Sequence, residues 1–138
     1  MPIITINTST VSALEAKLQL MTELNASFAE ELKIPSGHVH IHVLDGQCFA
    51  FGGDSSRPGA YITIKASALQ IWPEVRRDLA LKLTTLIQKH LDVPAERTTT
   101  MFEELPVENI AVGSNIAVFV KSPTAAATAE AASKAAAE

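Results

Sequence analysis

Pro2 offers the most specific chemistry in this sequence, because it follows the initiator Met1 and precedes a short apolar run at residues 3–6. Methionine aminopeptidase removes an initiator Met that precedes a small residue, so we expect the mature chain to begin at Pro2. Its amine would be secondary, and an apolar environment lowers the pKa of an α-amino group below its usual value near ~8. This pattern predicts a general base or nucleophile poised near neutral pH. The alternative is that Pro2 only begins an edge strand, where its missing N–H costs nothing.

Two lysines could place a positive charge beside such a base. Lys33 ends the first predicted helix, and Lys65 lies in the middle of a predicted strand. Either cation would hold a substrate carboxylate or stabilise an enolate oxygen. The alternatives are a solvated lysine favourable at a helix C-terminus for Lys33 and an edge-strand lysine whose ammonium reaches water for Lys65.

Three alternating histidines suggest a metal site. His38, His40 and His42 would point to one side of a strand, where imidazoles two residues apart can share a metal ion. Asp45 is the one carboxylate near them, and His90 lies on a predicted helix without a fitting spacing. We therefore expect no metal, with His40 and His42 satisfied by hydrogen bonds.

Other reactive groups give weaker signals. Glu103 and Glu104 are adjacent in a predicted strand and face opposite ways, so they cannot form an acid/base pair, and we expect them at a rim or interface. Cys48 has no activating neighbour in the sequence, and we expect a buried thiol.

The composition excludes several classes of protein. The 138 residues are 47% hydrophobic and 19% charged, which favours one compact domain. A net charge of −4 with dispersed Lys and Arg gives no nucleic-acid surface or polybasic membrane patch. The single cysteine fits a reducing compartment. Neither a membrane span nor a signal peptide is recognisable, so we expect a cytoplasmic protein.

The sequence repeats itself. Residues 2–9 match residues 60–67 at an offset of 58, and residues 32–35 match residues 91–94 at an offset of 59. A one-residue difference inside the intervening helices reconciles the two offsets. Two pairs of matching segments in the same order predict two copies of one supersecondary unit, at about residues 2–45 and 60–103.

Each copy predicts a strand, a helix and a second strand. In the first copy, Ser12 and Glu15 are spaced as a capping box, the helix ends before Pro35, and residues 39–43 alternate as a strand. The apolar stripe of this helix would consist of Leu14, Leu18, Met21, Leu24, Phe28 and Leu32.

In the second copy, residues 61–66 and 97–102 are the strands, and Pro73 suits the first turn of the helix. The apolar face of that helix would be made of Val75, Leu79, Leu83, Leu86 and Leu91. Further short strands are predicted at 49–51, 110–112 and 116–120.

These elements predict one fold. Parallel β-α-β crossovers are right-handed, so two of them give an α/β fold (α+β by some schemes): a four-stranded mixed sheet with two helices on one face. The other face would stay apolar and uncovered, which is typical of an assembly surface. We expect a domain at residues 1–122 and an Ala-rich mobile tail at 123–138.

An N-terminal proline on the first strand of a tandem β-α-β unit resembles the tautomerase superfamily, and more closely its macrophage migration inhibitory factor-like branch. The resemblance covers residues 2 to about 120. Its anchors are Pro2 with Asn7 and Thr8, residues 51–53 with Pro58, residues 94–97, and residues 112–115 with Phe119. The resemblance implies a homotrimer with sites at the subunit boundaries, each built around one Pro2, and needs no cofactor.

The resemblance also implies roles for particular residues. Lys33 would hold substrate from the end of the first helix, His38 stands where a tyrosine is common, and Ser67 replaces an isoleucine whose backbone N–H faces substrate. The partner subunit would contribute Thr99 and Met101, where tyrosine and asparagine are common. Ser114 replaces a tryptophan, and Phe119 keeps the closing phenylalanine. The resemblance therefore implies a pocket with fewer aromatic residues to bind an aryl substrate than is usual in the family.

The leading hypothesis is a cofactor-independent tautomerase that isomerises a small 2-keto acid, such as a phenylpyruvate-like compound, with Pro2 as general base. One alternative is a proline-based hydratase or dehalogenase of unsaturated acids, but Arg57, Arg76 and Arg77 are not clearly placed for it. Another is a protein-binding or signalling trimer with vestigial catalysis, for which family analogy also allows non-classical secretion.

Overall fold

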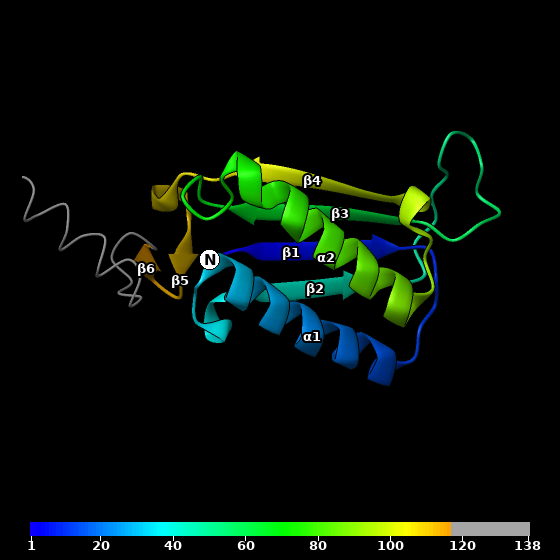
Figure 1. Ribbon diagram of the computed structural model, residues 1–138, viewed down its shortest axis with the longest axis horizontal. Coiled ribbons are helices and arrows are strands. Elements are labelled where there is room, and N and C mark those ends of the chain that lie inside the picture. Colours follow the sequence, from blue (N-terminus) through cyan, green and yellow to red (C-terminus); the bar gives the residue numbers. More distant parts are fainter. Residues whose placement is uncertain (117–138) are drawn as a thin grey trace, which may run out of the picture.

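A computed structural model describes residues 1–116 of the chain, and its central feature is a four-stranded sheet with two long helices across one face (Figure 1). The sheet and its helices run in the order β1 (Ile3–Thr8), α1 (Leu14–Leu32), β2 (His40–Leu44), β3 (Ala60–Ala66), α2 (Pro73–Leu91) and β4 (Thr98–Glu104). Three 3-10 turns lie at Ser36–His38, Ala95–Arg97 and Val107–Asn109, and the strands β5 (Ala111–Val112) and β6 (Asn115–Ile116) form a separate hairpin. The predicted tail lies outside the described residues.

The strand order confirms the predicted duplication. The sheet reads β2-β1-β3-β4, with β1 parallel to β2 and β3 parallel to β4, so each copy is one parallel β-α-β unit. The two units meet along the antiparallel pair of β1 and β3, with Thr5 directly opposite Thr63. The result is the mixed sheet with both helices on one side that the sequence predicts.

The duplication extends to the ends of the helices. Lys33 ends α1 and Asp92 ends α2, both in the left-handed region with φ of 55° and 57°. Each is followed two residues later by a proline, Pro35 or Pro94, and then by a 3-10 turn. A left-handed residue lets the last carbonyls of a helix receive hydrogen bonds from the exiting chain. His38 therefore lies in a 3-10 turn and not on the second strand, contrary to our expectation.

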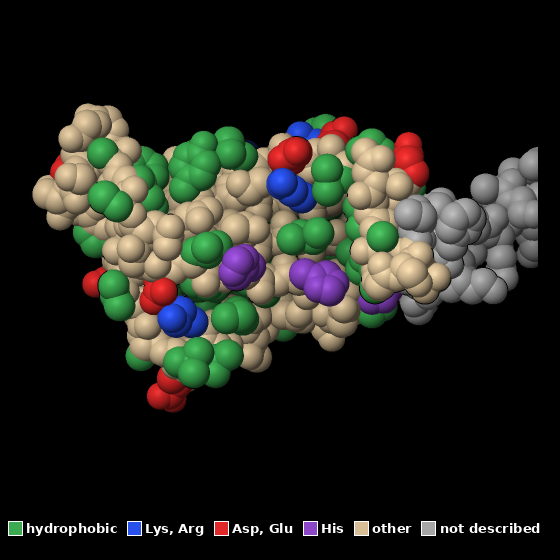
Figure 2. Space-filling model, turned by 180° about the vertical axis from the view of Figure 1, so that it is seen from behind, with side chains coloured by type: hydrophobic (Ala, Val, Ile, Leu, Met, Phe, Trp, Pro, Cys, Tyr) green, Lys and Arg blue, Asp and Glu red, His purple; other side chains and the backbone are tan. Residues whose placement is uncertain are grey.

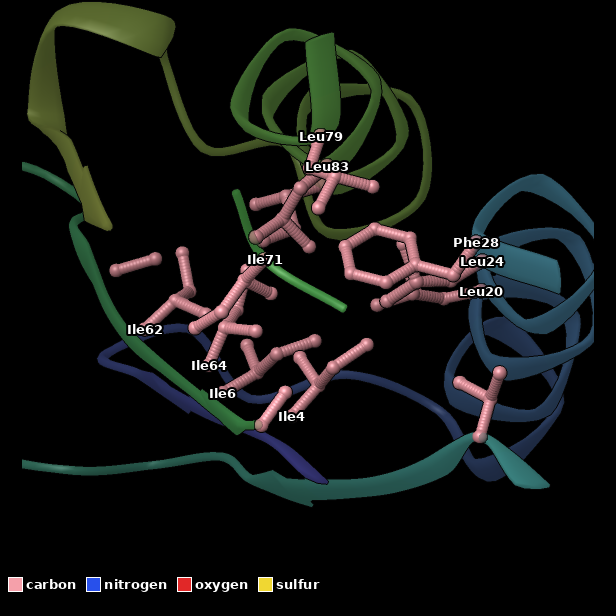
Figure 3. Close-up of a cluster of buried hydrophobic side chains, with 14 of the residues drawn as sticks. Ile4, Ile6, Leu20, Leu24, Phe28, Ile62, Ile64, Ile71, Leu79 and Leu83 are labelled. Carbon is pink, nitrogen blue, oxygen red and sulfur yellow. The ribbon is translucent and has the colours of Figure 1, made fainter. Parts of the chain in front are cut away.

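The core lies between the sheet and the helices. Alternate residues of β1 and β3, Ile4, Ile6, Ile62 and Ile64, have no exposed surface and point toward the helices (Figure 3). They meet Leu20, Leu24 and Phe28 of α1 and Leu79 and Leu83 of α2. Burial of each such side chain stabilises the fold by about 1.5–3 kcal/mol, so period-two strands and period-3.6 helices fix the layer arrangement together.

The helix predictions were partly wrong for α1. Leu14 and Leu18 are 67% and 51% exposed, whereas Leu20, which is not part of the predicted stripe, is fully buried. Leu18 and Leu20 are two residues apart, or about 200° around a helix, so only one of them can face the sheet. In α2, Pro73 lies in the first turn as predicted, and Ile87 is the buried residue where we expected Leu86, which is only partly buried.

The predicted capping box at Ser12 and Glu15 was also wrong. The N-cap of α1 is Ala13, which makes no side-chain capping hydrogen bond. A distant carboxylate serves this end of the helix: Asp45 Oδ2 accepts hydrogen bonds from the Ser12 backbone N–H at 3.2 Å and from Lys17 Nζ at 3.0 Å. The contact joins the beginning of α1 to the end of β2.

The uncovered face of the sheet is polar, which corrects our expectation of an apolar face (Figure 2). Strand register places its side chains in three rows: His40, Ile3, Lys65 and Glu103; His42, Thr5, Thr63 and Met101; Leu44, Asn7, Tyr61 and Thr99. Tyr61 and Met101 are its large exposed apolar side chains, at 40% and 42%. Exposed apolar area is therefore not the feature that would drive assembly through this face.

The loop between the two units is organised by a buried arginine. Arg97 is 6% exposed and donates hydrogen bonds to the carbonyl oxygens of Pro58 at 2.8 Å, Asp54 at 2.9 Å and Arg57 at 3.0 Å. Its guanidinium also lies 5.2 Å from the centre of the Phe51 ring. The predicted strand at 49–51 is absent from this loop; Phe51 makes one isolated bridge with Asp54.

The hairpin of β5 and β6 confirms two short strands around Gly113, which has a φ of 61°. It lies at the end of the sheet where the chain starts (Figure 1). The rest of the last predicted strand lies outside the described residues. No helix within residues 1–116 is long and apolar enough to cross a membrane.

Candidate active site

The beginning of the chain is anchored to the sheet. Pro2 is buried and immediately precedes β1. Its carbonyl oxygen accepts a hydrogen bond of 3.0 Å from the backbone N–H of His40, the first residue of β2. Because Pro2 has no N–H of its own, this bond and its ring packing hold it in place. The nitrogen of Pro2 is therefore fixed at one edge of the sheet.

The terminal amine lies beside Gln70. The Met1 ammonium donates a hydrogen bond of 2.6 Å to Gln70 Oε1. Partial burial lowers the pKa of this amine below its usual value, because a less aqueous environment disfavours the cation. The amine at this position therefore loses its proton more readily than a fully solvated terminal amine.

The open face beside Pro2 carries a row of titratable groups. His40 and Lys65 lie on either side of Ile3, in register on β2 and β3. Lys65 Nζ is 3.8 Å from Glu103 Oε2, with both side chains about half exposed. Lys65 is thus a cation on the open face near the chain start, although not on an edge strand. An exposed pair of this kind contributes little to stability, so its ammonium can turn toward an anion at low cost.

The two other predicted residues of this edge come from α1 and the turn after it. Lys33 is exposed at the C-cap of α1, and its backbone N–H is bonded to the carbonyls of Ala29 and Glu30. His38 is half-buried, and its backbone N–H donates to Pro35 at 3.0 Å. The left-handed C-cap and the 3-10 turn lead the chain from the end of α1 to the start of β2, so both residues lie at the Pro2 end of the sheet.

Ser67 directly follows β3 and lies at the same end of the sheet as Pro2. It is 8% exposed, and its carbonyl accepts hydrogen bonds from the backbone N–H groups of Gln70 at 2.9 Å and Ile71 at 3.2 Å. This turn is the element that holds Gln70 beside the chain start. On the helix side, Arg76 Nη2 forms an ion pair with Glu104 Oε1 at 2.6 Å, whereas Glu103 lies near Lys65 on the open face. Glu103 and Glu104 therefore face opposite sides of the sheet, as predicted.

Thr99 and Met101 lie away from Pro2 within one chain. Thr99 is in the row of Asn7, four residues along β1 from Ile3, or roughly 13 Å at the usual rise of a strand. Met101 is in the middle row, opposite Thr63. One chain therefore brings Pro2, Lys65, Ser67, Lys33 and His38 to one edge but leaves these two residues elsewhere.

A hollow of about 500 Å³ lies at the Thr99 end of the open face. Its aromatic and polar lining comes from Asn7, Gln47, Phe49, Phe51, Tyr61 and Thr99. Tyr61 is directly opposite Thr99, and its hydroxyl donates a hydrogen bond of 3.2 Å to Met101 Sδ. An aromatic side chain thus lies next to Thr99, where the resemblance implied a tyrosine that the sequence lacks.

Some predicted features differ or lie elsewhere. Cys48 is exposed beside this hollow and not buried as expected, because no strand forms at 49–51 to cover it. Ser114 is exposed in the turn between β5 and β6, and Phe119 lies outside the described residues. His40 and His42 are exposed, and their side chains make no hydrogen bond within residues 1–116, contrary to expectation. In the same part of the chain, no three His, Cys, Asp or Glu side chains gather in a way that could hold a metal ion.

Sequence reasoning missed Gln70 and Tyr61. Gln70 lies in a turn without a motif, and it reaches Met1 across 69 positions of the chain. Tyr61 belonged to a strand that we assigned, but its partner Thr99 is known only from the register of β3 and β4. Only the prediction that these strands are parallel neighbours could have brought Tyr61 and Thr99 together.

Comparison with known proteins gives consistent results. The sequence profile of the family described as macrophage migration inhibitory factor (MIF) matches residues 1–119. No curated protein is similar enough in sequence to match. Among solved structures, the MIF homologue from Prochlorococcus marinus has a TM-score of 0.76 at 23% identity, covering 83% of this chain and 98% of its own.

Two further solved structures have the same fold. The protein described as Pt0534 inactivated by 2-oxo-3-pentynoate has a TM-score of 0.72 at 18% identity, covering 83% of this chain and 94% of its own. The asymmetric trimer of wild-type fused 4-OT has a TM-score of 0.70 at 21% identity, covering 83% of this chain and 95% of its own.

Proposed function

Because the chain belongs to the macrophage migration inhibitory factor family, we propose that it is a cofactor-independent tautomerase that interconverts the keto and enol forms of a small 2-keto acid. Pro2, freed by removal of Met1, would be the general base. The observation that carries the proposal is the placement of the chain start: Pro2 is buried and bonded to His40, and burial lowers the pKa of the amine beside it.

The reaction follows from the chemistry of a secondary amine. The neutral Pro2 nitrogen takes a proton from the carbon next to the substrate's carbonyl, and the electron pair of the broken C–H bond moves toward the carbonyl oxygen. Protonation of that oxygen gives the enol. In the reverse direction the enol loses its O–H proton, and the Pro2 ammonium returns a proton to carbon. No electrons are lost or gained, so no redox partner is required.

Positive charge at this edge would bind the acid. Lys65 reaches the open face beside Ile3, and Lys33 lies at the end of α1. We assign them to the substrate carboxylate and the developing enolate, because a fixed cation stabilises charge that grows in the transition state. His38 and Ser67 would line the same pocket.

The proposed assembly is a homotrimer that completes the site. Pro2 and the pair Thr99 and Met101 lie in different rows of the open face, so a second subunit is needed to bring them together. A protein with a similar fold is described as a trimer. Thr99 and Met101 would face Pro2 of the neighbouring subunit, with Phe119 closing the pocket. Sedimentation as a monomer would contradict this arrangement.

The arginine-dependent alternative has less support. Arg76 is engaged by Glu104 and by the carbonyl of Ile71 at 2.8 Å. Arg57 shortly precedes Ala60, which pairs with Thr8 at the opposite end of β1 from Pro2, and it lies near Asp54 and Glu96. Neither guanidinium is available beside the chain start to polarise an unsaturated acid.

The direct test combines intact mass with a tautomerase assay. Mass spectrometry shows whether Met1 is removed, and phenylenolpyruvate turnover is measured across pH. We expect activity that rises through a near-neutral pKa and falls at least about 100-fold in Pro2→Ala, since general acid–base catalysis contributes ~10²–10⁴-fold. Pro73→Ala, at the exposed start of α2, is the matched control. A processed chain without turnover on 2-keto acids would overturn the proposal and favour a binding role.

A covalent probe gives a second test. 2-Oxo-3-pentynoate, which inactivates Pt0534, has an internal alkyne conjugated to a ketone. A neutral amine adds to the alkyne carbon that bears the methyl group, β to the ketone, and the neighbouring alkyne carbon takes up a proton. The exposed thiol of Cys48 would react too, so the experiment uses a Cys48→Ser background. We expect one adduct per chain, at Pro2. Labelling spread over lysines would contradict an activated terminal amine.

A further inference from the structure

The turn after β3 holds the Gln70 side chain at a defined place. The backbone N–H groups of Gln70 and Ile71 both donate to the Ser67 carbonyl, and Ile71 has no exposed surface. Arg76 Nε donates to the Ile71 carbonyl at 2.8 Å, which ties the turn to α2. The backbone at residue 70 is therefore fixed at the edge of the sheet where the chain begins.

The carboxamide of Gln70 binds the chain start itself. Its Oε1 accepts the 2.6 Å hydrogen bond from the Met1 ammonium, the one hydrogen bond that this amine makes within residues 1–116. The Pro2 nitrogen is only two carbon atoms away from the Met1 nitrogen along the chain. The three rotatable bonds of a glutamine side chain let Oε1 follow the amine by that distance while the backbone of the turn stays in place.

We propose that Gln70 is a positioning residue that holds the Pro2 amine of the mature chain through its carboxamide oxygen and directs the nitrogen lone pair toward the open face. The inference rests on the proposed function, because it assumes that Pro2 becomes the terminus. A neutral proline amine has one N–H and one lone pair. When the N–H is bonded to Gln70, the lone pair points elsewhere, and we assign it to the open face, where Lys65 lies opposite Ile3.

The same contact balances the effect of burial. Burial disfavours the cation, whereas an acceptor such as Oε1 stabilises it. The titratable side chains at this edge are His40 on β2, Lys65 with Glu103 on β3 and β4, and His38 and Lys33 after α1; Glu104 is bonded to Arg76 on the helix side. Gln70 is neutral, so it tunes the amine without adding another titrating charge.

The test compares two substitutions of Gln70 that should shift the pKa of the Pro2 amine in opposite directions. Gln70→Leu removes the acceptor and must lower the pKa of the Pro2 amine, while Gln70→Glu adds a carboxylate and must raise it. In the Cys48→Ser background at pH 6, labelling with 2-oxo-3-pentynoate follows the neutral fraction of the amine, and we expect it to be about three- to tenfold faster than the parent in Gln70→Leu and slower by a similar factor in Gln70→Glu. Above about pH 10, where the amine is neutral in every variant, lost orientation should make Gln70→Leu slower than the parent. Gln88→Leu, exposed on α2, is the matched control and must behave like the parent.

The Pro2 amine is also titrated directly by NMR with ¹³C-labelled proline. This titration needs no turnover, so its result does not depend on whether the protein is a tautomerase. If the pKa of the Pro2 amine shifts in opposite directions in the two variants but no tautomerase activity is found, the role of Gln70 is supported and the proposed enzyme activity is contradicted. Identical titrations in all three proteins would overturn the inference. If a preparation retains Met1, the same experiment on ¹³C-labelled methionine tests the contact directly, and an unchanged Met1 amine in Gln70→Leu would overturn it equally.

Discussion

The Pro2 carbonyl oxygen and the His40 backbone N–H are joined by a 3.0 Å hydrogen bond that extends the pairing of β1 and β2 to the second residue of the chain. Most chain termini fray because nothing holds them. Here Pro2 is held by β2, and Met1 by Gln70 on the other side. The sheet thus holds the backbone at Pro2, and the proposed removal of Met1 would leave the Pro2 amine at this fixed position.

An N-terminal extension should abolish turnover without unfolding the protein. Any residue attached before Pro2 converts its nitrogen to an amide, which cannot accept a proton near neutral pH. We expect activity to fall at least about 100-fold, with thermal stability nearly unchanged. The measurement compares phenylenolpyruvate turnover of a chain tagged at the N-terminus with one tagged at the C-terminus. Equal activity of the two would show that the base is another residue.

Tyr61 should supply the aromatic contact that Thr99 lacks. Tyr61→Ala removes the ring that lies next to Thr99 and Met101, and we expect the KM for an aryl substrate to rise by roughly 3- to 10-fold, since aromatic contacts contribute about 0.5–1.5 kcal/mol. Tyr61→Phe keeps the ring and should keep the KM. An aliphatic 2-keto acid serves as the control substrate, because its KM should respond little to either change.

Replacing Arg97 by lysine should destabilise the protein despite the retained charge. The planar guanidinium serves three carbonyls and the Phe51 ring at once, and an ammonium cannot reproduce that geometry. We expect the free energy of unfolding to fall by about 2–4 kcal/mol in urea titrations. Arg77→Lys, exposed on α2, is the control and should change it by less than about 0.5 kcal/mol.

The protein should lose stability in acid through Glu23. Hydrogen bonds from His90 at 2.7 Å and from Lys89 lower the pKa of this carboxyl below its usual 4.5. The unfolded chain therefore binds more protons than the folded one below about pH 5, so stability decreases as the pH falls through that window. Glu23→Gln should flatten this part of the curve of unfolding free energy against pH.

Glu15→Gln, in the first turn of α1 where no hydrogen bond of its side chain is formed within residues 1–116, is the control for this effect. Its curve should keep the slope of the parent. Equal slopes for the parent and Glu23→Gln between pH 3 and 5 would contradict the role of this contact.

Gly59→Ala should disturb the loop that contains the aromatic hollow. A Cβ at this position would lie 2.6 Å from the Phe51 ring and 3.1 Å from Phe49, so both rings must move. We expect a lower melting temperature and a weakened response of KM to Tyr61 substitution, because the hollow changes shape. Gly37→Ala, where a Cβ meets nothing within 4 Å, should leave the melting temperature nearly unchanged.

The sequence predicted the fold well because the fold depends on local pattern and repetition. Alternation identified β2, Pro35 marked the end of α1 and Pro73 the beginning of α2, and the offsets of the repeats implied two like units. The errors occurred where a distant group overrides a local signal. Asp45 stabilises the beginning of α1 in place of Ser12, and the sheet selects Leu20 over Leu18 because only one can face it.

The site could be predicted only in part, for the same reason. Pro2 is identifiable from its position, and Lys65 from its place in a strand. Gln70 and Tyr61 carry no motif, and their significance depends on contacts across 69 residues in one case and on strand register in the other. The exposure of Cys48 and the polar open face likewise depend on which strands form and on how they pair.

The pairing of Thr5 with Thr63 places the axis that relates the two halves of the chain at the middle of the sheet. Under that relation the counterpart of Pro2 is Ala60, whose nitrogen is joined to Gly59. In a pair of separate units nothing would join the end of one to the start of the other, whereas here Gly59 links Ala60 to the first unit. The second start has become a covalent junction, held where Gly59 accepts the Ser9 backbone N–H at 3.0 Å. Two halves built alike are thereby unequal, because the loop that leads into β3 carries the aromatic hollow.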